Sequence, residues 1–265
     1  MELITNRKPT AGTICAAIFD FDGTISTLRF GWEKVMLPMM MEMLGGEETD
    51  SSLYKMVTDY IDKSTGIQTI YQMMWLTEQM EAAGLSVKGR DAWWYKEEYN
   101  RRLMKSVSQR IESIKKGTAR PEDYTMKGAE TFLQALKKRN VNLYLASGTD
   151  HDDVCKEAAL LGVAPLFSHI RGAPKQQAAC PKEAVIRTLI EEEAISASQL
   201  LIVGDGKVEI SLGAKIGAFT IGIASDEEQR CGINPLKRER LITAGADFII
   251  GDFEDKEGIL SILGL

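Results

Sequence analysis

Residues 14–24 read Ile-Cys-Ala-Ala-Ile-Phe-Asp-Phe-Asp-Gly-Thr, and this stretch decides the predicted fold. The apolar run from Ile14 to Phe19 lacks a helical period and is typical of a strand buried on both faces, as in a parallel sheet. Asp20 and Asp22 follow it, where open α/β sheets bind ligands. A divalent cation such as Mg2+ would offset the repulsion between two neighbouring carboxylates. Alternatively, the pair only forms the turn before a helix.

The length and charge of the chain narrow the classes of function. Its 265 residues exceed a typical single domain, so one large or two modest domains are expected. The formal net charge of −6 argues against nucleic-acid binding, because such proteins need a basic surface to neutralise phosphate backbones. A small anionic substrate remains compatible with this charge, since a local cationic pocket can form on an acidic protein.

Cysteine usage and hydrophobicity predict the environment of the protein. The four cysteines show neither Cys-x-x-Cys spacing nor the density of a disulfide scaffold, and only two histidines are available for a zinc site. Asp20 and Asp22 interrupt the early apolar run, so it does not resemble a secretory signal. No segment approaches the ~20 apolar residues of a membrane helix. We expect a soluble cytoplasmic protein without a membrane partner, and its oligomeric state stays open.

Two patterns of hydrophobic spacing divide the chain. After Pro121 strands and helices alternate, which indicates a three-layer α/β fold with a parallel sheet between helices. From Trp32 to about Lys116 the spacing is helical, with four or more helices interrupted by glycines. We therefore expect a core formed by residues 1–28 and 122–265 and an all-helical insertion at 29–121. The core should contain strands at 14–19, 141–146, 168–171, 200–203, 219–223 and 248–250, and helices at 127–139, 152–161, 181–193, 209–216 and 236–244.

Several side chains of the insertion have structural interpretations. Residues 50–52, Asp-Ser-Ser, are candidates to cap one helix, and Asp91 is a candidate to cap another. The methionine-rich stretch 36–43 is typical of core or interface packing. The aromatic cluster at 93–95, Trp-Trp-Tyr, favours burial on a helix face over a role in lining a ligand pocket.

Two further strand ends carry polar groups. Residues 147–149, Ser-Gly-Thr, are expected to form a turn whose hydroxyl and backbone amides can bind an anion, although the tripeptide taken alone favours simple capping of the next helix. Residues 204–206, Gly-Asp-Gly, place Asp205 after another strand, with Glu209 four residues later. This acidic turn resembles the first strand end in chemistry, but Gly-Asp-Gly is also common in ordinary turns.

A lysine near a helix start is the candidate cation. Lys182 follows Pro181 in the expected first turn of a helix, where the dipole disfavours a positive charge unless an anion faces it. Lys182 would neutralise charge if carboxylates lie nearby, and a solvated surface lysine is the alternative. Lys175 is a rival for the same role.

The order of these groups resembles the haloacid dehalogenase superfamily of phosphohydrolases. Its four motifs are Asp-x-Asp-x-Thr, a strand-terminal Ser or Thr, a Lys, and Gly-Asp-x-x-x-Asp, and the matching positions begin at Asp20, Ser147, Lys182 and Gly204. The spacing from Lys182 to the fourth motif resembles that of phosphoserine-phosphatase-like members, which favours it over Lys175. The resemblance implies a Rossmann-like core with a helical cap inserted after the first motif.

The resemblance also implies roles for individual residues. Asp20 would attack phosphorus as the nucleophile, and Asp22 would act as general acid and then as base. Thr24 would support the first loop and, with Gly148, contact phosphate. Ser147 would donate a hydrogen bond to the phosphoryl group.

The remaining roles concern charge. Lys182 would steady Asp20 and the phosphate, and Mg2+ would be held by the carboxylates of Asp20 and Asp205 and the backbone carbonyl of Asp22. Glu209 departs from the family pattern, which most often has Asp there, so its role is left open.

The predicted function is a Mg2+-dependent phosphatase that hydrolyses a small phosphorylated metabolite, with sugar phosphates the first guess, through an aspartyl-phosphate. A phosphomutase of the same superfamily and a catalytically idle binding module are the alternatives. The cap would set specificity, and Arg29, Phe30 and Trp32 near its hinge are candidates to touch the substrate. Arg29 is a candidate to pair with an anionic substrate group, and a surface or cap-packing role is the alternative. Further candidates are Arg90, Arg101, Arg102 and Lys105, but they lie in a charged helical region where solvated faces are the default interpretation. His151 lies next to residues 147–149, and for it we favour a position at the start of a helix over an approach to the site.

Overall fold

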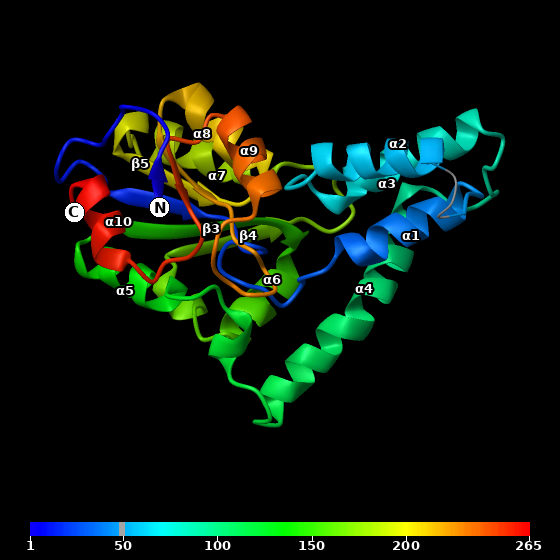
Figure 1. Ribbon diagram of the computed structural model, residues 1–265, viewed down its shortest axis with the longest axis horizontal. Helices are drawn as coiled ribbons and strands as arrows, with labels where there is room; N and C mark the ends of the chain where they lie inside the picture. The colour runs from blue at the N-terminus through cyan, green and yellow to red at the C-terminus, as the bar shows by residue number, and fades with distance from the viewer. Residues whose placement is uncertain (48–50) are drawn as a thin grey trace.

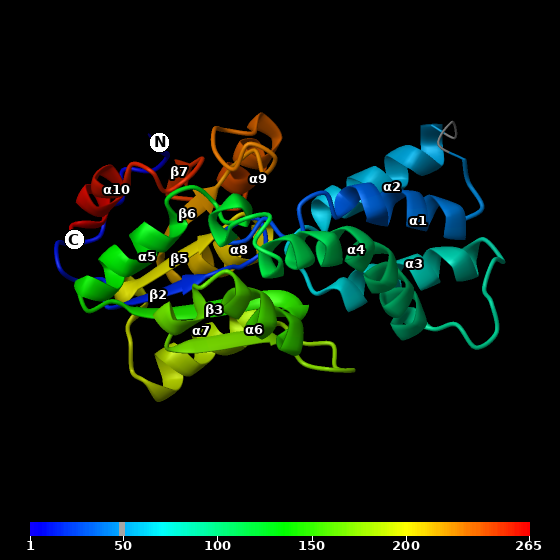
Figure 2. The ribbon, with the colours of Figure 1, turned by 90° about the horizontal axis from the view of Figure 1, so that it is seen from below.

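The computed structural model describes residues 1–47 and 51–265, and these form a seven-stranded sheet in the order β1-β7-β6-β5-β2-β3-β4 (Figures 1 and 2). All neighbouring strands are parallel except β1 and β7, which are antiparallel. The strands are β1 (Glu2–Leu3), β2 (Ala16–Phe19), β3 (Asn142–Asp150), β4 (His169–Ala173), β5 (Leu200–Gly204), β6 (Phe219–Ile223) and β7 (Phe248–Ile250).

Helices cover both faces of the sheet, which gives three layers (Figure 1). Alternate residues of a strand point to opposite faces, so Phe19 of β2 belongs to a hydrophobic cluster with residues of α5, α6 and α10, whereas Ile18 belongs to a cluster with residues of α7 and α8. The helices are α5 (Ala129–Lys138), α6 (His151–Leu160), α7 (Pro181–Arg187), α8 (Lys207–Ile216), α9 (Pro235–Thr243) and α10 (Lys256–Leu263). Short 3-10 helices occupy Pro121–Tyr124, Ala164–Leu166 and Ala197–Gln199, and a π-helix at Thr188–Glu192 continues α7.

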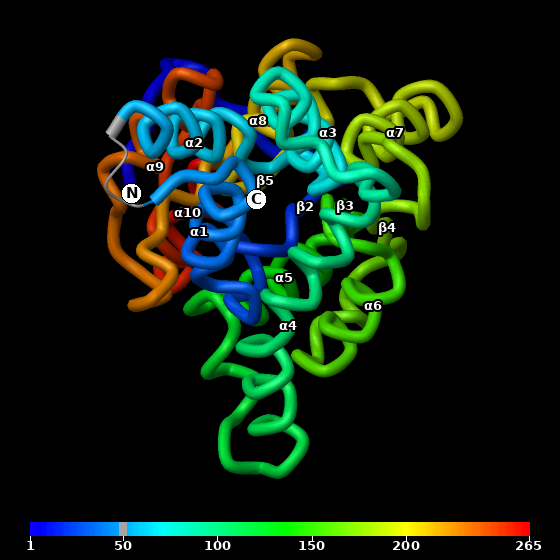
Figure 3. The backbone as a smooth tube through the Cα atoms, turned by 90° about the vertical axis from the view of Figure 1, so that its right-hand side faces the viewer, coloured from blue at the N-terminus to red at the C-terminus, as the bar shows by residue number. Residues whose placement is uncertain are grey.

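The segment between β2 and α5 forms a helical cap domain with its own hydrophobic cluster. Its helices are α1 (Glu33–Met43), α2 (Ser51–Lys63), α3 (Thr69–Ala82) and α4 (Ala92–Lys115). Met36, Met39, Met40 and Met41 are buried in this cluster, which confirms the packing role predicted for residues 36–43. Figure 3 looks from the side of these helices, and the ends of β2 and β3 lie behind them.

Two capping predictions for the cap domain have different outcomes. The Asp91 side chain accepts a hydrogen bond from the Trp94 amide at 3.0 Å, so Asp91 is the N-cap of α4 as predicted. The predicted cap at residues 50–52 cannot be compared, because Asp50 lies outside the described residues. Tyr95 is buried in the cap cluster, in line with the helix-face interpretation of residues 93–95.

The structure corrects several sequence predictions. Strand β3 continues through Asp150 with a register shift after Ala146, so Ser147, Gly148 and Thr149 belong to an irregular strand end and not to a separate turn. The first buried strand starts at Ala16 instead of Ile14. Strand β1 and helix α10 were not predicted, and β1 makes the sheet mixed rather than purely parallel. Among the residues that the structure describes, no helix combines the length and apolarity needed to cross a bilayer.

Candidate active site

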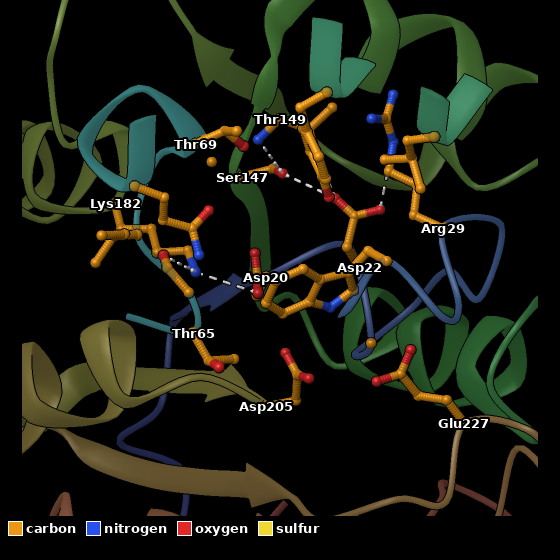
Figure 4. Close-up of a pocket in the computed structure, with 18 residues that line it drawn as sticks. Asp20, Asp22, Arg29, Thr65, Thr69, Ser147, Thr149, Lys182, Asp205 and Glu227 are labelled. Atoms are coloured by element: carbon orange, nitrogen blue, oxygen red, sulfur yellow. Dashed lines mark hydrogen bonds and ion pairs between the residues drawn. The ribbon is translucent and has the colours of Figure 1, made fainter. Parts of the chain in front are cut away.

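The central strand places the first acidic pair beside the two other motif strands. β2 lies between β3 and β5, and Phe19 pairs with Leu145 on one side and with Val203 on the other. The residues that follow these positions therefore meet at one edge of the sheet. The Asp20 amide donates to the Val203 carbonyl at 2.9 Å, which holds the nucleophile candidate against β5. Figure 4 shows Asp20, Ser147, Lys182 and Asp205 pointing into one pocket.

The loop after β2 passes so close to Asp205 that it requires glycine. Gly23 has a φ of 74°, and a Cβ atom there would lie 2.3 Å from Oδ2 of Asp205. Thr24 behind it is fully buried, and its hydroxyl has no hydrogen-bond partner in the described part of the chain. Thr24 does not line the pocket, so the structure gives no support to direct contact between its side chain and phosphate. Gly148 does line the pocket.

Lys182 occupies the position predicted for the motif lysine. Its side chain is only 4% exposed, and Nζ lies 3.1 Å from Oδ2 of Asp20 and 2.7 Å from Oε2 of Glu209. Burial alone would lower the pKa of Lys182, but the two carboxylates outweigh it and the pKa is raised. Lys175, in contrast, is 81% exposed and pairs with Asp152 at 2.9 Å. The structure thus brings Lys182, and not Lys175, to Asp20.

Asp22 has one satisfied and one unsatisfied carboxylate oxygen. Oδ2 accepts hydrogen bonds from Thr149 Oγ1 at 2.7 Å and from Ser147 Oγ at 3.4 Å. Oδ1 is buried without a hydrogen-bond partner among residues 1–47 and 51–265, and its closest cation is Arg29 Nε at 3.9 Å. Burial raises the pKa of Asp22, while Arg29 and the Thr149 hydroxyl oppose that rise. A carboxyl with a raised pKa is suited to donating a proton.

Three carboxylates gather around the position where a metal ion was predicted. Oxygens of Asp20, Asp205 and Glu209 all lie within 4.8 Å of one another. Burial raises the pKa of Asp20 well above its usual range; the Lys182 ammonium opposes this rise, and the neighbouring carboxylates add to it. Such a set of hard oxygen donors, with more negative charge than Lys182 alone can offset, fits Mg2+.

Glu209 contacts both Lys182 and the backbone. Its Oε1 accepts a hydrogen bond from the Gly206 amide at 2.7 Å, and Oε2 pairs with Lys182. Gly204 makes this arrangement possible, because a Cβ atom on Gly204 would lie 2.2 Å from Oε1 of Glu209. Both oxygens of the glutamate are thus engaged with the chain itself.

A second lysine at the site was not predicted. Lys237 Nζ lies 2.8 Å from Oδ2 of Asp205 and also pairs with Glu227, which lines the pocket. Lys237 stands in the first turn of α9, two residues after Pro235. The same signal that identified Lys182, a cation in the first turn of a helix behind a proline, could have found it.

The cap contributes one wall of the pocket. Among the described residues, this wall consists of Trp32, Thr65, Gly66, Ile67, Thr69, Gln72, Tyr99 and Leu103. The Gly66 carbonyl accepts a hydrogen bond from Lys182 at 3.4 Å, so the loop between α2 and α3 reaches the catalytic lysine candidate. Sequence reasoning missed this loop, whose polar and small residues give no periodic signal.

The cationic cap residues proposed from the sequence lie elsewhere. Arg101 and Arg102 pair with Glu98, Arg90 stacks on the Trp94 ring, and Lys105 is exposed. None of these residues lines the pocket, and neither does Phe30. Trp32 and Arg29, in contrast, do line it. His151 begins α6 outside the pocket, which agrees with its helix-start interpretation.

Polar contacts hold the cap against the core. Asp62 of α2 pairs with Arg240 at 3.0 Å and with Lys207 at 3.3 Å. Gln68, at the start of α3, accepts a hydrogen bond from the Ala179 amide at 2.9 Å. Lys96 of α4 pairs with Asp150 at 2.5 Å. These contacts join the cap to the core at three places around the pocket.

Comparison with known proteins identifies the family. A model of haloacid dehalogenase-like hydrolases matches residues 14–217, and the chain belongs to this family of hydrolases. The match spans all four motif positions named above. The predicted α/β core and helical cap are thereby confirmed.

Solved structures of similar fold are HAD-like proteins with low sequence identity. A protein from Haemophilus somnus described as a predicted phosphoglycolate phosphatase matches with a TM-score of 0.59 and 18% identity, over 93% of this chain and 98% of that one. A predicted phosphatase from Clostridium acetobutylicum matches with a TM-score of 0.59 and 21% identity, over 94% of this chain and 99% of that one. A β-phosphoglucomutase from Clostridium difficile matches with a TM-score of 0.61 and 17% identity, over 94% of this chain and 97% of that one. No curated protein sequence matches the chain significantly.

Proposed function

We propose that the chain is a Mg2+-dependent phosphatase that hydrolyses a small phosphorylated metabolite through an aspartyl-phosphate on Asp20. The observation that carries the proposal is the 3.1 Å contact between the Asp20 carboxylate and the Lys182 ammonium inside the pocket. A carboxylate becomes an effective nucleophile toward phosphorus when cations offset the negative charge of the phosphate. The free cysteines and the acidic net charge support a cytoplasmic protein with no nucleic-acid partner.

The donor set described above supports a bound Mg2+. The carboxylates of Asp20 and Asp205 and the backbone carbonyl of Asp22 would hold the ion. Glu209 belongs to the same acidic cluster, but its two oxygens already bind the Gly206 amide and Lys182. When bound, Mg2+ supplies positive charge next to the transferring phosphoryl group. Lys182 contributes a second positive charge, 3.1 Å from Oδ2 of Asp20.

The side chains support a two-step reaction. Asp20 attacks phosphorus while the bond from phosphorus to the substrate oxygen breaks, and the Asp22 carboxyl gives its proton to that oxygen. In the second step Asp22 accepts a proton from water, the water oxygen attacks phosphorus, and the bond to Asp20 breaks to release inorganic phosphate. Ser147 donates a hydrogen bond to the phosphoryl oxygens. Catalysis then depends mainly on positioning and charge stabilisation.

The pocket size favours a small substrate. Its volume is about 100 Å³, compared with roughly 300–1,000 Å³ for sites that hold drug-sized ligands. A sugar phosphate of modest size is our first candidate. A phosphomutase would use the same first step but return the phosphoryl group to substrate, so its product would be an isomer and not inorganic phosphate.

Phosphate release from a panel of phosphorylated metabolites, measured with and without Mg2+, tests the proposal. We expect release that stops in EDTA and in the Asp20→Asn variant, and that persists in Asp152→Asn, whose side chain lies on the surface. Release without any divalent cation, or full activity of Asp20→Asn, would overturn the mechanism. Isomerisation of a sugar phosphate without phosphate release would identify a mutase.

A further inference from the structure

The pocket has a core end for the phosphoryl group and a cap end for the rest of the substrate. Asp20, Ser147 and Lys182 lie at the core end (Figure 4). The rest of the ester must then extend toward the wall formed by the cap. The chemistry of that wall determines which phosphate esters fit.

The cations that line the pocket are already committed to carboxylates of the protein. Among the described lining residues they are Arg29 and Lys182. Lys182 lies between Asp20 and Glu209, at the core end. Its charge is therefore shared by two carboxylates of the protein, and its contact with the cap is a hydrogen bond to the Gly66 carbonyl.

Arg29 is held even more completely. Its Nη2 lies 2.6 Å from Oε1 of Glu157, and its Nε donates to the other oxygen of the same carboxylate at 3.2 Å. Asp153 at 3.5 Å and Asp22 at 3.9 Å complete its surroundings. This bidentate pair is buried, because Glu157 is 3% exposed and the Arg29 side chain 10%. Arg29 therefore lines the pocket with its positive charge already neutralised by the neighbouring carboxylates.

The remaining charges of the pocket are negative. Asp205 and Glu227 line it and both pair with Lys237, which lies outside the lining, while Asp22 lines it as the carboxyl that carries the proton for the first step. A second anionic group on a substrate would leave water and approach these carboxylates without a free cation to receive it. Burial of an unpaired charge and repulsion between like charges both oppose its binding.

Apart from Arg29, the described cap residues that line the pocket carry no charge. Trp32, Ile67, Tyr99 and Leu103 offer aromatic and aliphatic surface, and Thr69 and Gln72 offer hydrogen-bonding groups. This combination suits a leaving group that carries hydroxyls and carbon surface but no charge.

We propose that the site selects phosphate monoesters whose alcohol part is uncharged and hydroxylated, and that it discriminates against esters carrying a carboxylate or a second phosphate. This inference rests on the proposed phosphatase function and narrows its substrate class. It separates the chain from one structural neighbour by name, the predicted phosphoglycolate phosphatase, since phosphoglycolate carries a carboxylate. Phosphorylated glucose, named in the phosphoglucomutase neighbour, has an uncharged hydroxylated alcohol part and belongs to the class that we expect the site to accept. The discriminating feature is the neutralisation of Arg29 by Glu157.

A matched pair of esters tests the selection. 2-Hydroxyethyl phosphate and phosphoglycolate have similar sizes but differ in the charge of the group distant from phosphorus. We expect kcat/KM to be about 10–100-fold higher for the uncharged ester. Equal values, or a preference for phosphoglycolate, would overturn the proposal.

Two variants test the cause. Glu157→Gln keeps the shape of the side chain but releases the charge of Arg29, so the ratio of phosphoglycolate to 2-hydroxyethyl phosphate turnover should rise about tenfold. Asp152→Asn, on the same helix but at the surface, should leave the ratio unchanged. Thr69→Lys should also raise the ratio, and Thr69→Gln should not. If neither Glu157→Gln nor Thr69→Lys raises it, pocket charge does not set the selection.

Binding of non-hydrolysable analogues separates this inference from the proposed function. Calorimetry with 3-hydroxypropylphosphonate and 3-phosphonopropanoate compares an uncharged with an anionic ligand and needs no turnover. We expect tighter binding of the hydroxylated phosphonate by about tenfold or more. If no ester is hydrolysed but this order of affinities holds, the phosphatase assignment fails and the selection stands. If esters are hydrolysed but the anionic phosphonate binds more tightly, the proposed selection for uncharged substrates is wrong and the phosphatase function stands.

Discussion

The ammonium of Lys182 lies 2.7 Å from Oε2 of Glu209, and both side chains are almost completely buried. The glutamate stands where the haloacid dehalogenase pattern most often has aspartate. Because its other oxygen accepts the Gly206 amide, Glu209 is held in place from one side and holds Lys182 on the other. We infer that its main task is to position Lys182 against Asp20.

Replacement of Glu209 by glutamine tests this positioning role. A hydrogen bond to a charged group contributes about 1.5–3 kcal/mol, so Glu209→Gln should lower kcat/KM by about 10–100-fold. The Mg2+ concentration that gives half-maximal activity should change little, and steady-state kinetics at varied Mg2+ measures both. A large rise in that concentration at unchanged kcat would show instead that Glu209 is a metal ligand.

Removal of the lysine should destabilise the fold as well as abolish activity. Lys182→Met leaves Asp20 and Glu209 buried without their cation, which should cost about 3–5 kcal/mol of unfolding free energy. Adding Glu209→Gln removes one of the unpaired charges, so the double variant should regain part of that loss. Urea denaturation of the two single variants and the double variant measures the coupling. Additive effects would mean that the two side chains do not interact.

Mg2+ should stabilise the folded chain, since the acidic cluster binds it only when folded. At 100 times the dissociation constant the gain is about 2.7 kcal/mol, which corresponds to a rise in Tm of roughly 5–10 °C for a chain of this size. Asp205→Asn should lose most of this rise, whereas Glu254→Gln, at an exposed position, should keep it. Thermal unfolding with and without Mg2+ measures the rise in Tm for each variant. An equal rise in Asp205→Asn and Glu254→Gln would show that Mg2+ does not bind at Asp205.

The pH dependence of activity should respond to Thr149. Its hydroxyl donates to Asp22 and favours the ionised form, which lowers the pKa of that carboxyl. Thr149→Val removes the donor, so the pKa of Asp22 should rise further and the carboxyl should keep its proton to a higher pH. Because Asp22 acts first as an acid, the alkaline limb of the kcat/KM profile should move up by about one pH unit. A limb that stays in place or moves down would contradict the assignment of Asp22.

The fold and the core of the site could be predicted because strand ends have a simple geometry. Asp20, Ser147 and Asp205 each follow a recognisable apolar run, and parallel strands bring their ends to one edge. The position of a cation at a helix start made Lys182 a candidate, and its spacing to the fourth motif of the resembling family favoured it over Lys175. These signals are local, so a single sequence carries them.

Other parts of the site depend on contacts between residues that are distant in sequence, which no local sequence pattern reveals. The loop around Gly66 reaches Lys182 only because the whole cap folds over the sheet. Arg29 was a candidate for an anionic substrate group, and its neutralisation by Glu157 comes from a helix more than a hundred residues away. Strand β1 has only two residues, too few to show a period. Distant pairing of this kind requires the tertiary structure.

Direct detection of the phosphorylated residue tests the central claim most directly. Rapid acid quench of the enzyme during turnover, followed by borohydride reduction, converts an aspartyl-phosphate to homoserine, which peptide mass spectrometry locates in the chain. We predict homoserine at position 20, and its absence when substrate is omitted. Active enzyme that yields no modified residue under these conditions, or a modified residue at another position, would contradict the account.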